Sequence, residues 1–282
     1  MSFTLGIDVG AVYTKAVLVD EERGVRGRAL VKTGFNLPGA SSAAMAQVLD
    51  ESHVDRGEIE YVASTGYGRY MVPFRDVQIT ELTCHAKGAF EAFPQTRTVL
   101  DAGGQTVKAI KVDGRGKVRA FRLNDKCAAG TGAFLEKTAR YMGFDPADIG
   151  ELAMKSEVPA TISSVCAVFA ESEVINHLTS GTKAEDIMYG AVFSLARRSV
   201  QLMRRVGLEQ AFTFVGGMSR NEAFIKALEF ELNASLNIPG DGAGHFNGAL
   251  GAGLLALERL NKLKATGEWT QVLAARQLAA SA

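Results

Sequence analysis

The stretch Gly6-Ile7-Asp8-Val9-Gly10 decides the fold, together with a second stretch, Asp101-Ala102-Gly103-Gly104-Gln105. The first closes an apolar run, Phe3–Val9, and turns through glycine into another run of β-forming residues. Two such runs joined by a glycine turn predict a β-hairpin. The second stretch lies in the same way between the runs Thr98–Leu100 and Thr106–Val112, so it predicts a second hairpin.

An ungapped overlay of the two hairpins indicates an internal duplication. At an offset of 93 residues the identical pairs are Asp8/Asp101, Gly10/Gly103, Lys15/Lys108, Ala16/Ala109, Val19/Val112 and Asp20/Asp113. A period this long with only two copies predicts two related lobes, because a solenoid stacks three or more shorter repeats.

Helix signals fill most of the remaining chain. Asp145-Pro146 supplies the N-cap and first-turn proline of one helix. The capping-box pairs Thr182-x-x-Glu185 and Ser219-x-x-Glu222 predict helices over Lys183–Val206 and Arg220–Asn233. Strands alternating with helices predict an α/β protein.

A last helix, predicted over Phe246–Lys264, has mostly small residues on its opening turns, which predicts a close backbone approach there. No linker rich in proline or serine separates the two halves. We expect a first lobe at residues 1–95 and a second at residues 96–282, with a C-terminal helix that is able to return to the first lobe.

Composition narrows the functional class. The 282 residues carry 31 basic and 31 acidic side chains, which argues against a dedicated nucleic-acid binder or a membrane-surface protein. Charged residues interrupt every apolar run near the N-terminus, so neither an export signal nor a membrane span is predicted and we expect a cytoplasmic protein. Three widely spaced cysteines argue against a disulfide framework.

The two Asp-x-Gly hairpins predict a phosphate site. A strand that ends in a carboxylate and turns through glycine exposes backbone N–H groups to an anion, beside an acidic group able to hold hydrated Mg²⁺. A purely structural explanation is that any β-hairpin favours Asp and Gly in its turn. That explains one Asp-x-Gly hairpin but not two superposable hairpins with a lysine at the same position. The predicted phosphate-binding residues are Gly10, Lys15, Gly103, Gly104 and Lys108, and the predicted metal-side carboxylates are Asp8 and Asp101.

A third glycine turn follows the predicted strand Phe212–Val215. Gly216, Gly217 and Asn221 precede or open a helix there, and a helix N-terminus beside a flat glycine pair is able to receive an adenosine. The order phosphate, phosphate, adenosine resembles the nucleotide site of the actin, Hsp70 and sugar-kinase superfamily, over nearly the whole chain.

Cys127 and Cys166 each stand immediately ahead of a predicted helix. A helix N-terminus lowers the pKa of a thiol and stabilises a thiolate. Each cysteine alone is ordinarily a buried, inert thiol. Two cysteines from each of two subunits complete a four-thiolate site if both loops reach a two-fold axis.

The stretches Asn124–Gly132 and Ile162–Ile175, with the two hairpins, closely resemble the BadF/BadG/BcrA/BcrD-type ATPases. These are the activators of 2-hydroxyacyl-CoA dehydratases and the ATPase subunits of ATP-dependent benzoyl-CoA reductases. The resemblance implies ATP or ADP with Mg²⁺, and one [4Fe–4S] cluster shared by two subunits, with Cys127 and Cys166 as ligands. Ala11 departs from the pattern, because relatives usually have Ser or Thr beside the glycine.

The resemblance also implies the partners and the reaction. The protein would form a homodimer or a pseudo-symmetric heterodimer with a related subunit. It would take electrons from ferredoxin or flavodoxin and use ATP hydrolysis to pass them at low potential to a catalytic iron–sulfur component that acts on an acyl-CoA. Gln105 is the candidate to orient the attacking water. A small-molecule kinase of the same superfamily and a non-catalytic ATP-binding regulatory protein are the alternatives, and neither uses the two cysteines.

Three further features bear on packing and partners. Cys84 beside His85 is interpreted as core packing, because adjacent helical residues point in different directions. The basic run Lys108–Lys126 fits a solvated hairpin face and a docking surface for an acidic partner equally. The tail Asn261–Ala282, with the only tryptophan, Trp269, favours a permanent partner and so slightly favours the reductase-type subunit.

Overall fold

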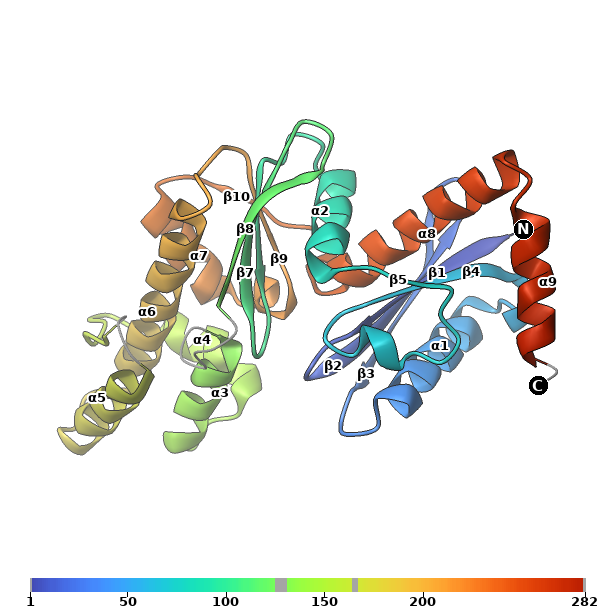
Figure 1. Cartoon of the computed structure of the whole chain (residues 1–282). Helices are drawn as coiled ribbons and strands as arrows, with labels where there is room; N and C mark the ends of the chain where they lie inside the picture. The colour runs from blue at the N-terminus through green and yellow to red at the C-terminus, as the bar shows by residue number, and fades with distance from the viewer. Residues whose placement is uncertain (1, 125–130, 164–166, 281–282) are drawn as a thin grey trace. The chain divides into compact units, whose positions relative to one another are not determined.

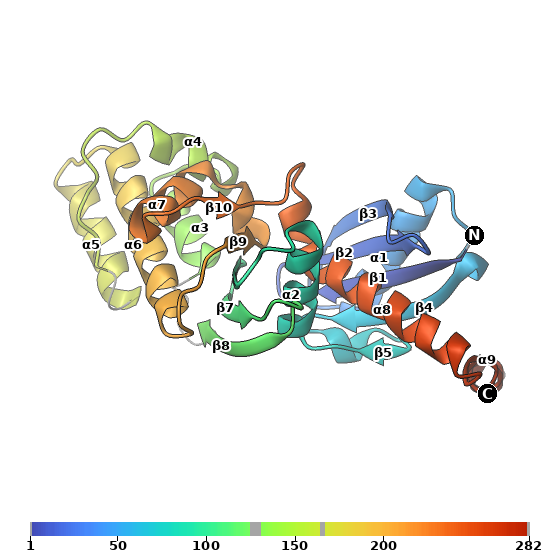
Figure 2. The same cartoon turned by 90° about the horizontal axis from the view of Figure 1, so that it is seen from above.

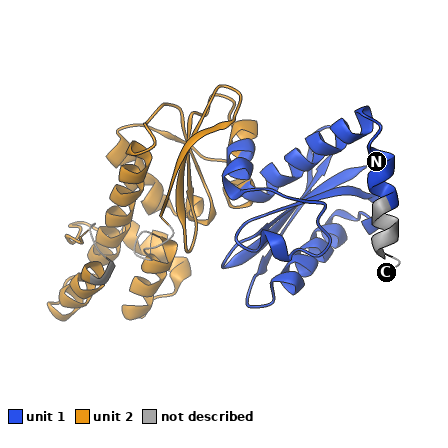
Figure 3. Cartoon of the chain, in the orientation of Figure 1, with its two compact units in different colours: residues 1–88, 248–282 blue, residues 89–247 orange. Residues whose placement is uncertain are grey.

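The computed structural model describes residues 2–124, 131–163 and 167–280. The chain forms two compact units, residues 1–88 with 248–282 and residues 89–247 (Figure 3). The first lobe expected from the sequence, 1–95, ends later than the first unit because the chain leaves that unit inside a continuous helix. The C-terminal part, which was expected within 96–282 with a helix able to return to the first lobe, belongs to the first unit. No helix in the described part of the chain is both long and apolar enough to cross a membrane.

The first unit is built on a five-stranded sheet. The strand order is β3-β2-β1-β4-β5, in which β1, β2 and β3 form an antiparallel meander and β4 and β5 run parallel to β1. The strands are β1 (Phe3–Val9), β2 (Tyr13–Asp20), β3 (Val25–Lys32), β4 (Ile59–Thr65) and β5 (Val77–Gln78). The helices are α1 (Leu37–Ser52), α2 (Glu81–Ala92), α8 (Asn247–Ala265) and α9 (Trp269–Ala280), of which α2 continues into the second unit.

Helices cover both faces of this sheet. Ala44 and Val48 of α1 pack with β1 and with Val62 of β4, whereas Ala252 of α8 packs with Tyr61 on the opposite face of β4. The predicted close approach at the start of α8 is confirmed, because a Cβ on Gly6 would lie 1.9 Å from the carbonyl oxygen of Ala249. Figures 1 and 2 show α8 passing along the sheet of the first unit.

The second unit repeats this sheet. The strand order is β10-β9-β6-β7-β8, again an antiparallel meander extended by two parallel strands. The strands are β6 (Thr98–Ala102), β7 (Val107–Val112), β8 (Val118–Asn124), β9 (Phe212–Val215) and β10 (Leu236–Asn237). The helices are α3 (Gly132–Tyr141), α4 (Ile149–Met154), α5 (Ala167–Thr179), α6 (Ala184–Arg204) and α7 (Glu222–Leu232). The predicted α/β class and the internal duplication are confirmed.

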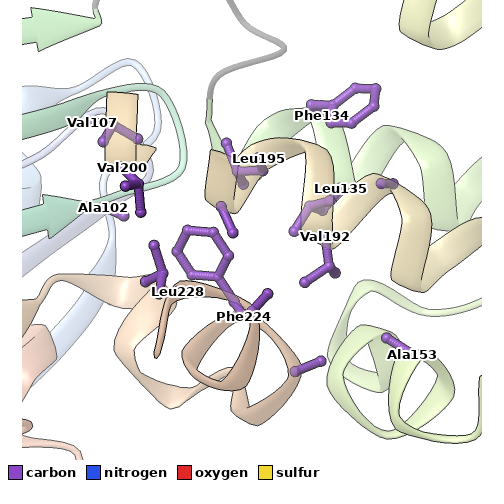
Figure 4. Packing of buried hydrophobic residues seen from close by; sticks show 14 of the residues in the cluster. Ala102, Val107, Phe134, Leu135, Ala153, Val192, Leu195, Val200, Phe224 and Leu228 are labelled. Carbon is purple, nitrogen blue, oxygen red and sulfur yellow. The ribbon is translucent and has the colours of Figure 1, made fainter. Parts of the chain in front are cut away.

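The core of the second unit lies between its sheet and its helices. Leu195 and Val200 of α6 and Phe224 of α7 pack against Ala102 and Val107 of the hairpin (Figure 4). The ring of Phe224 lies edge-on to Phe214 of β9, with 5.5 Å between the ring centroids. The second hairpin therefore rests on the largest apolar cluster found in the described residues.

Two predicted helix caps are wrong. The N-cap of α6 is Lys183 and not Thr182, whose hydroxyl lies instead 3.4 Å from His177 Nδ1. Ser219 lies in a 3₁₀ turn, Gly217–Arg220, where its hydroxyl donates to the carbonyl of Gly216. Because Ser219 is inside this 3₁₀ turn, it does not cap the following α-helix. The N-cap of α7 is Asn221 instead.

Asp145 caps a 3₁₀ turn and not an α-helix. Its carboxylate accepts a hydrogen bond of 2.8 Å from the backbone N–H of Ala147, and the turn covers Pro146–Asp148. The α-helix, α4, begins only at Ile149. The sequence therefore predicts the position of this helix start correctly. It does not predict that the first turn is a 3₁₀ turn.

Candidate functional site

The first hairpin carries a buried ion pair at its turn. Asp8 and Lys15 are opposite each other in the antiparallel register of β1 and β2, and Lys15 Nζ lies 3.1 Å from Asp8 Oδ2. Both side chains are largely buried, so each charge needs the other. A Cβ on Gly10 would lie 2.8 Å from the carbonyl oxygen of Tyr13 and 3.0 Å from Lys15 Nζ. Glycine at this position is what lets the ammonium group lie against the turn.

The second hairpin repeats this arrangement. Lys108 Nζ lies 2.8 Å from Asp101 Oδ2 and also donates to the hydroxyl of Thr106 at 2.9 Å. The backbone N–H of Gly103 donates to the carbonyl of Thr106 at 2.9 Å, as Gly10 donates to Tyr13 at 3.1 Å in the first hairpin. Gln105 is exposed at this turn. The structure therefore places the residues predicted for phosphate and magnesium at equivalent points of the two units.

A third glycine completes each copy of the site. Gly66 follows β4 with φ +90°, and Gly216 follows β9 with φ +93°. A Cβ on Gly66 would lie 2.4 Å from Asp8 Oδ1 and one on Gly216 would lie 2.5 Å from Asp101 Oδ1. Each glycine thus allows the backbone of the neighbouring parallel strand to pack on the carboxylate. Gly66 is not among the residues predicted from the sequence, because only the pairing of β4 with β1 brings it to Asp8.

Replacing Gly216 with alanine is expected to lower the melting temperature more than the same change at Gly143. Both glycines have positive φ, but nothing lies within 4 Å of a Cβ on Gly143, so that variant measures the backbone cost alone. That cost is about 1 kcal/mol. Gly216→Ala adds a clash with Asp101 Oδ1 and the Ala102 carbonyl. Equal shifts in thermal unfolding for the two variants would show that the packing of Gly216 on Asp101 contributes nothing.

The residues predicted for adenosine lie together after β9. Gly217 faces His245, since a Cβ on this glycine would lie 3.4 Å from His245 Nε2. Asn221 is the N-cap of α7, and its Oδ1 accepts a hydrogen bond of 2.9 Å from the backbone N–H of Phe224. The side-chain oxygen of Asn221 is therefore engaged within the protein, and a contact of this residue with a ligand stays a prediction.

Helix α3 begins directly on the turn of the second hairpin. The backbone N–H of Gly132 donates to the carbonyl of Gly103 at 3.1 Å, and that of Ala133 donates to Gly104 at 2.7 Å. The first N–H groups of a helix have no partner within the helix. Here the carbonyls of the Gly103-Gly104 pair satisfy two of them, so the hairpin and α3 are joined by backbone hydrogen bonds.

Of the three cysteines, Cys84 is the one within the described residues. Its side chain is fully buried among Tyr61, Ala63 and Ala252, which confirms that it packs in the core. Burial raises the pKa of the Cys84 thiol to about 12. A cysteine enclosed by these apolar side chains does not fit a ligand of a cluster that two subunits share. Cys127 and Cys166, the predicted ligands, lie outside the described residues.

The segments beside the two predicted cluster ligands are described. Strand β8 ends at Asn124 and α3 begins at Gly132, on either side of the Cys127 segment, and α5 begins at Ala167, immediately after Cys166. Cysteine thiolates are the usual ligands of [4Fe–4S] clusters. Two cysteines ahead of helix N-termini are therefore a donor set that fits half of such a cluster.

The basic run Lys108–Lys126 is partly neutralised by the fold. Lys108 pairs with Asp101, Lys111 Nζ lies 3.2 Å from Glu209 Oε2, and an Arg119 guanidinium nitrogen lies 2.7 Å from Asp113 Oδ2. These pairs lower the net positive charge that the hairpin presents. A docking surface on it stays a prediction.

Known proteins resemble the chain over almost its full length. A family model described as the BadF/BadG/BcrA/BcrD ATPase family matches residues 5–256. The (R)-2-hydroxyglutaryl-CoA dehydratase activating ATPase of Acidaminococcus fermentans is 39% identical over 261 residues, which are 92% of this chain and 99% of that protein. A benzoyl-CoA reductase subunit from Thauera aromatica is 33% identical over 280 residues, with 95% and 98% covered.

Solved structures agree with the sequence matches. The activator of the 2-hydroxyisocaproyl-CoA dehydratase from Clostridium difficile, with bound ADPNP, has a TM-score of 0.87 and 36% identity, over 94% of this chain and 97% of that one. A ROK family glucokinase from Streptomyces griseus, at 17% identity and TM-score 0.58 over 91% and 100% of the two chains, shares the fold alone. The predicted fold and the predicted resemblance are both confirmed. The chain belongs to the BadF/BadG/BcrA/BcrD ATPase family.

Proposed function

We propose that this protein is an ATPase that drives a low-potential electron to a separate iron–sulfur enzyme acting on an acyl-CoA. The observation that carries the proposal is the junction of the second phosphate hairpin with α3, where Gly103 and Gly104 accept hydrogen bonds from the first N–H groups of the helix. The segment that holds Cys127 immediately precedes this helix. The helix that is bonded to the predicted phosphate loop is therefore the one that follows the predicted cluster ligand in the sequence.

Each predicted residue of the nucleotide site has a chemical role. Asp8 and Asp101 supply carboxylate oxygens, the hard ligands that Mg²⁺ prefers in its hydrated form. Lys15 and Lys108 hold those carboxylates in place. The N–H groups of Gly10 and Gly103 close their own turns, and the residues that follow them in each turn offer backbone N–H groups to the phosphates of ATP. Gln105, exposed at its turn, orients the water that attacks the terminal phosphate. Gly216 and Gly217 receive the adenosine.

Cys127 and Cys166 of two subunits would hold a [4Fe–4S] cluster, which would supply a one-electron carrier between a donor of the ferredoxin or flavodoxin class and the catalytic partner. ATP and water give ADP and phosphate, and the loss of the terminal phosphate changes the charge that the Gly103 turn must accommodate. Because α3 is bonded to that turn, a shift of the turn moves the N-terminus of this helix, which follows Cys127 in the sequence.

The partner that this chain fits best is a 2-hydroxyacyl-CoA dehydratase. The sequence favoured a permanent reductase complex because the tail carries Trp269. In the structure, Trp269 packs with the first unit, and its ring centroid lies 6.1 Å from that of Tyr61. A tryptophan that packs within its own unit does not require a partner chain. The activating ATPase from Acidaminococcus is also more similar to the chain, at 39% identity, than the reductase subunit, at 33%. The alternative function, a small-molecule kinase, is supported only by the similarity of fold to the ROK family glucokinase.

The bound nucleotide is expected to change the redox midpoint potential of the cluster or the rate at which its iron is chelated. Anaerobically purified protein should be brown and hold four irons per dimer, and ADP and a non-hydrolysable ATP analogue should give different redox midpoints or different rates of iron chelation. Coupling is reciprocal, so reduction of the cluster should change nucleotide affinity by the same free energy. Identical midpoints and chelation rates in the apo, ADP and analogue states would contradict the electron-transfer function.

A further inference from the structure

A stripe of residues on α6 holds the chain that leads toward Cys166. Successive members of the stripe are four residues apart, so each lies one turn further along the helix surface. At the start of the stripe, a carboxylate oxygen of Asp186 accepts hydrogen bonds of 2.8–3.1 Å from the hydroxyl of Ser156 and from the next two backbone N–H groups. The members of the stripe are Asp186, Gly190, Ser194 and Arg198.

Glycine at position 190 lets the segment 156–163 pack directly on the backbone of α6. A Cβ on Gly190 would lie 2.2 Å from the carbonyl oxygen of Ala160. Further along the segment, Ile162 is buried in the same apolar cluster as Ile187 of α6. The segment is therefore held on this helix by packing as well as by hydrogen bonds.

Ser163, the last described residue before Cys166, is held through both of its backbone polar groups. Its carbonyl oxygen accepts hydrogen bonds from the Ser194 hydroxyl at 2.8 Å and from an Arg198 guanidinium nitrogen at 3.1 Å. Its N–H donates to a carboxylate oxygen of Glu173. Hydrogen bonds that involve an ionised group are stronger than those between neutral groups. We call Glu173, Ser194 and Arg198 the Ser163 clasp.

The clasp joins the two described ends of the chain on either side of Cys166. Glu173 belongs to α5, which begins at Ala167, so its hydrogen bond ties Ser163 to the helix that follows the cysteine. The chain from Ser163 to Ala167 is four residues long and spans at most about 14 Å. Both attachment points of this short link are therefore held to each other and to α6.

We propose, on the basis of the electron-transfer function argued above, that Glu173 and Arg198 are positioning residues for Cys166. By holding Ser163 to α5 and α6, they restrict where the thiolate between the two attachment points lies, so that the ligand is preorganised for iron. Groups that orient a metal ligand typically affect metal affinity by about 10- to 100-fold. The two side chains have this effect without touching the iron.

Glu173→Ala is expected to lose iron to a chelator about tenfold faster than the wild type, after anaerobic reconstitution of both proteins. In iron-free protein, iodoacetamide should alkylate Cys166 about tenfold faster in the variant, because the clasp no longer holds the chain beside it. Cys127, which the clasp does not flank, should react at the wild-type rate, and mass spectrometry of the two peptides measures both. Glu173→Gln keeps an oxygen that accepts from the Ser163 N–H and should restore most of both properties.

Arg198→Met keeps an unbranched apolar stem and removes the guanidinium. It should accelerate iron loss and Cys166 alkylation by a smaller factor than Glu173→Ala, because Ser194 still donates to the Ser163 carbonyl. Arg197→Met is the matched control, since it changes the neighbouring arginine of α6, whose Nε lies 2.8 Å from a carboxylate oxygen of Glu231. The control should keep the wild-type rates.

Three results bear on the clasp and on the function separately. Wild-type rates in both Glu173→Ala and Arg198→Met would overturn the positioning role. Equal acceleration at Cys127 and Cys166 would also overturn it, because the change would then loosen the whole unit. A wild type that binds no iron would instead contradict the proposed function, and the alkylation of iron-free protein would still test whether the clasp holds the chain at Cys166.

Discussion

Replacing Cys127 or Cys166 with serine is expected to abolish iron binding by the dimer. A change in one chain appears twice in a homodimer, so either variant removes two of the four thiolates that a [4Fe–4S] cluster requires. A serine hydroxyl ionises much less readily than a thiol and is a much weaker ligand for this cluster. The measurement is iron and sulfide content, with the visible absorption spectrum, after anaerobic reconstitution of each variant.

Cys84→Ser is expected to keep its iron. The Cys84 side chain is fully buried in the core of the first unit, so it does not reach a cluster shared by two subunits. Iron lost from this variant, with full iron retained in the Cys127 and Cys166 variants, would reverse the assignment of the ligands. Nucleotide binding should survive in all three variants, because the hairpins that carry Asp8 and Asp101 are intact, and this readout separates loss of the cluster from loss of the fold.

Asp101→Asn is expected to lower kcat for ATP hydrolysis by about 100-fold and to change ADP affinity far less. A group that organises magnesium and water acts most strongly where charge develops in the transition state, and losing one such group costs about 10² to 10³ in rate. The amide oxygen of asparagine still accepts a hydrogen bond from Lys108, and Thr106 holds the same ammonium group. The hairpin should therefore fold, and steady-state hydrolysis with calorimetry of ADP binding measures the two effects separately.

Asp113→Asn is the matched control for this variant. Asp113 lies at the other end of the same hairpin, where its carboxylate accepts hydrogen bonds of 2.9 Å from the backbone N–H groups of Arg115 and Lys117. Those bonds and its pairing with Arg119 lower the pKa of Asp113, so removing the charge should cost a little stability at neutral pH. It should leave hydrolysis unchanged. Small and equal losses of rate and affinity in Asp101→Asn would make Asp101 a turn residue only.

The local features of the site follow from the sequence because they are formed by neighbours. A hairpin pairs residues a few positions apart, so the repeated Asp, Gly and Lys spacing predicts both hairpins and also places each lysine opposite its aspartate. The small residues of α8 likewise predict its close packing before any partner is known. Helix starts are less well predicted, since Ser219 and Asn221 compete for the same cap and the 3₁₀ turn decides between them.

By itself, the sequence determined the α/β class, the duplication, the two Asp–Lys hairpins and the family, since each depends on residues close together in the chain or on the residues themselves. The tertiary structure alone decided that Gly66 and Gly248 lie against Asp8 and that Gly216 packs on Asp101. It also decided that α8 returns to the first unit, which the sequence allowed but did not require. These contacts join segments distant in sequence, through the pairing of β4 with β1 and the packing of α8 on α2. The spacing of residues within one segment does not predict these contacts, because they form only when burial of the whole sheet brings distant segments together.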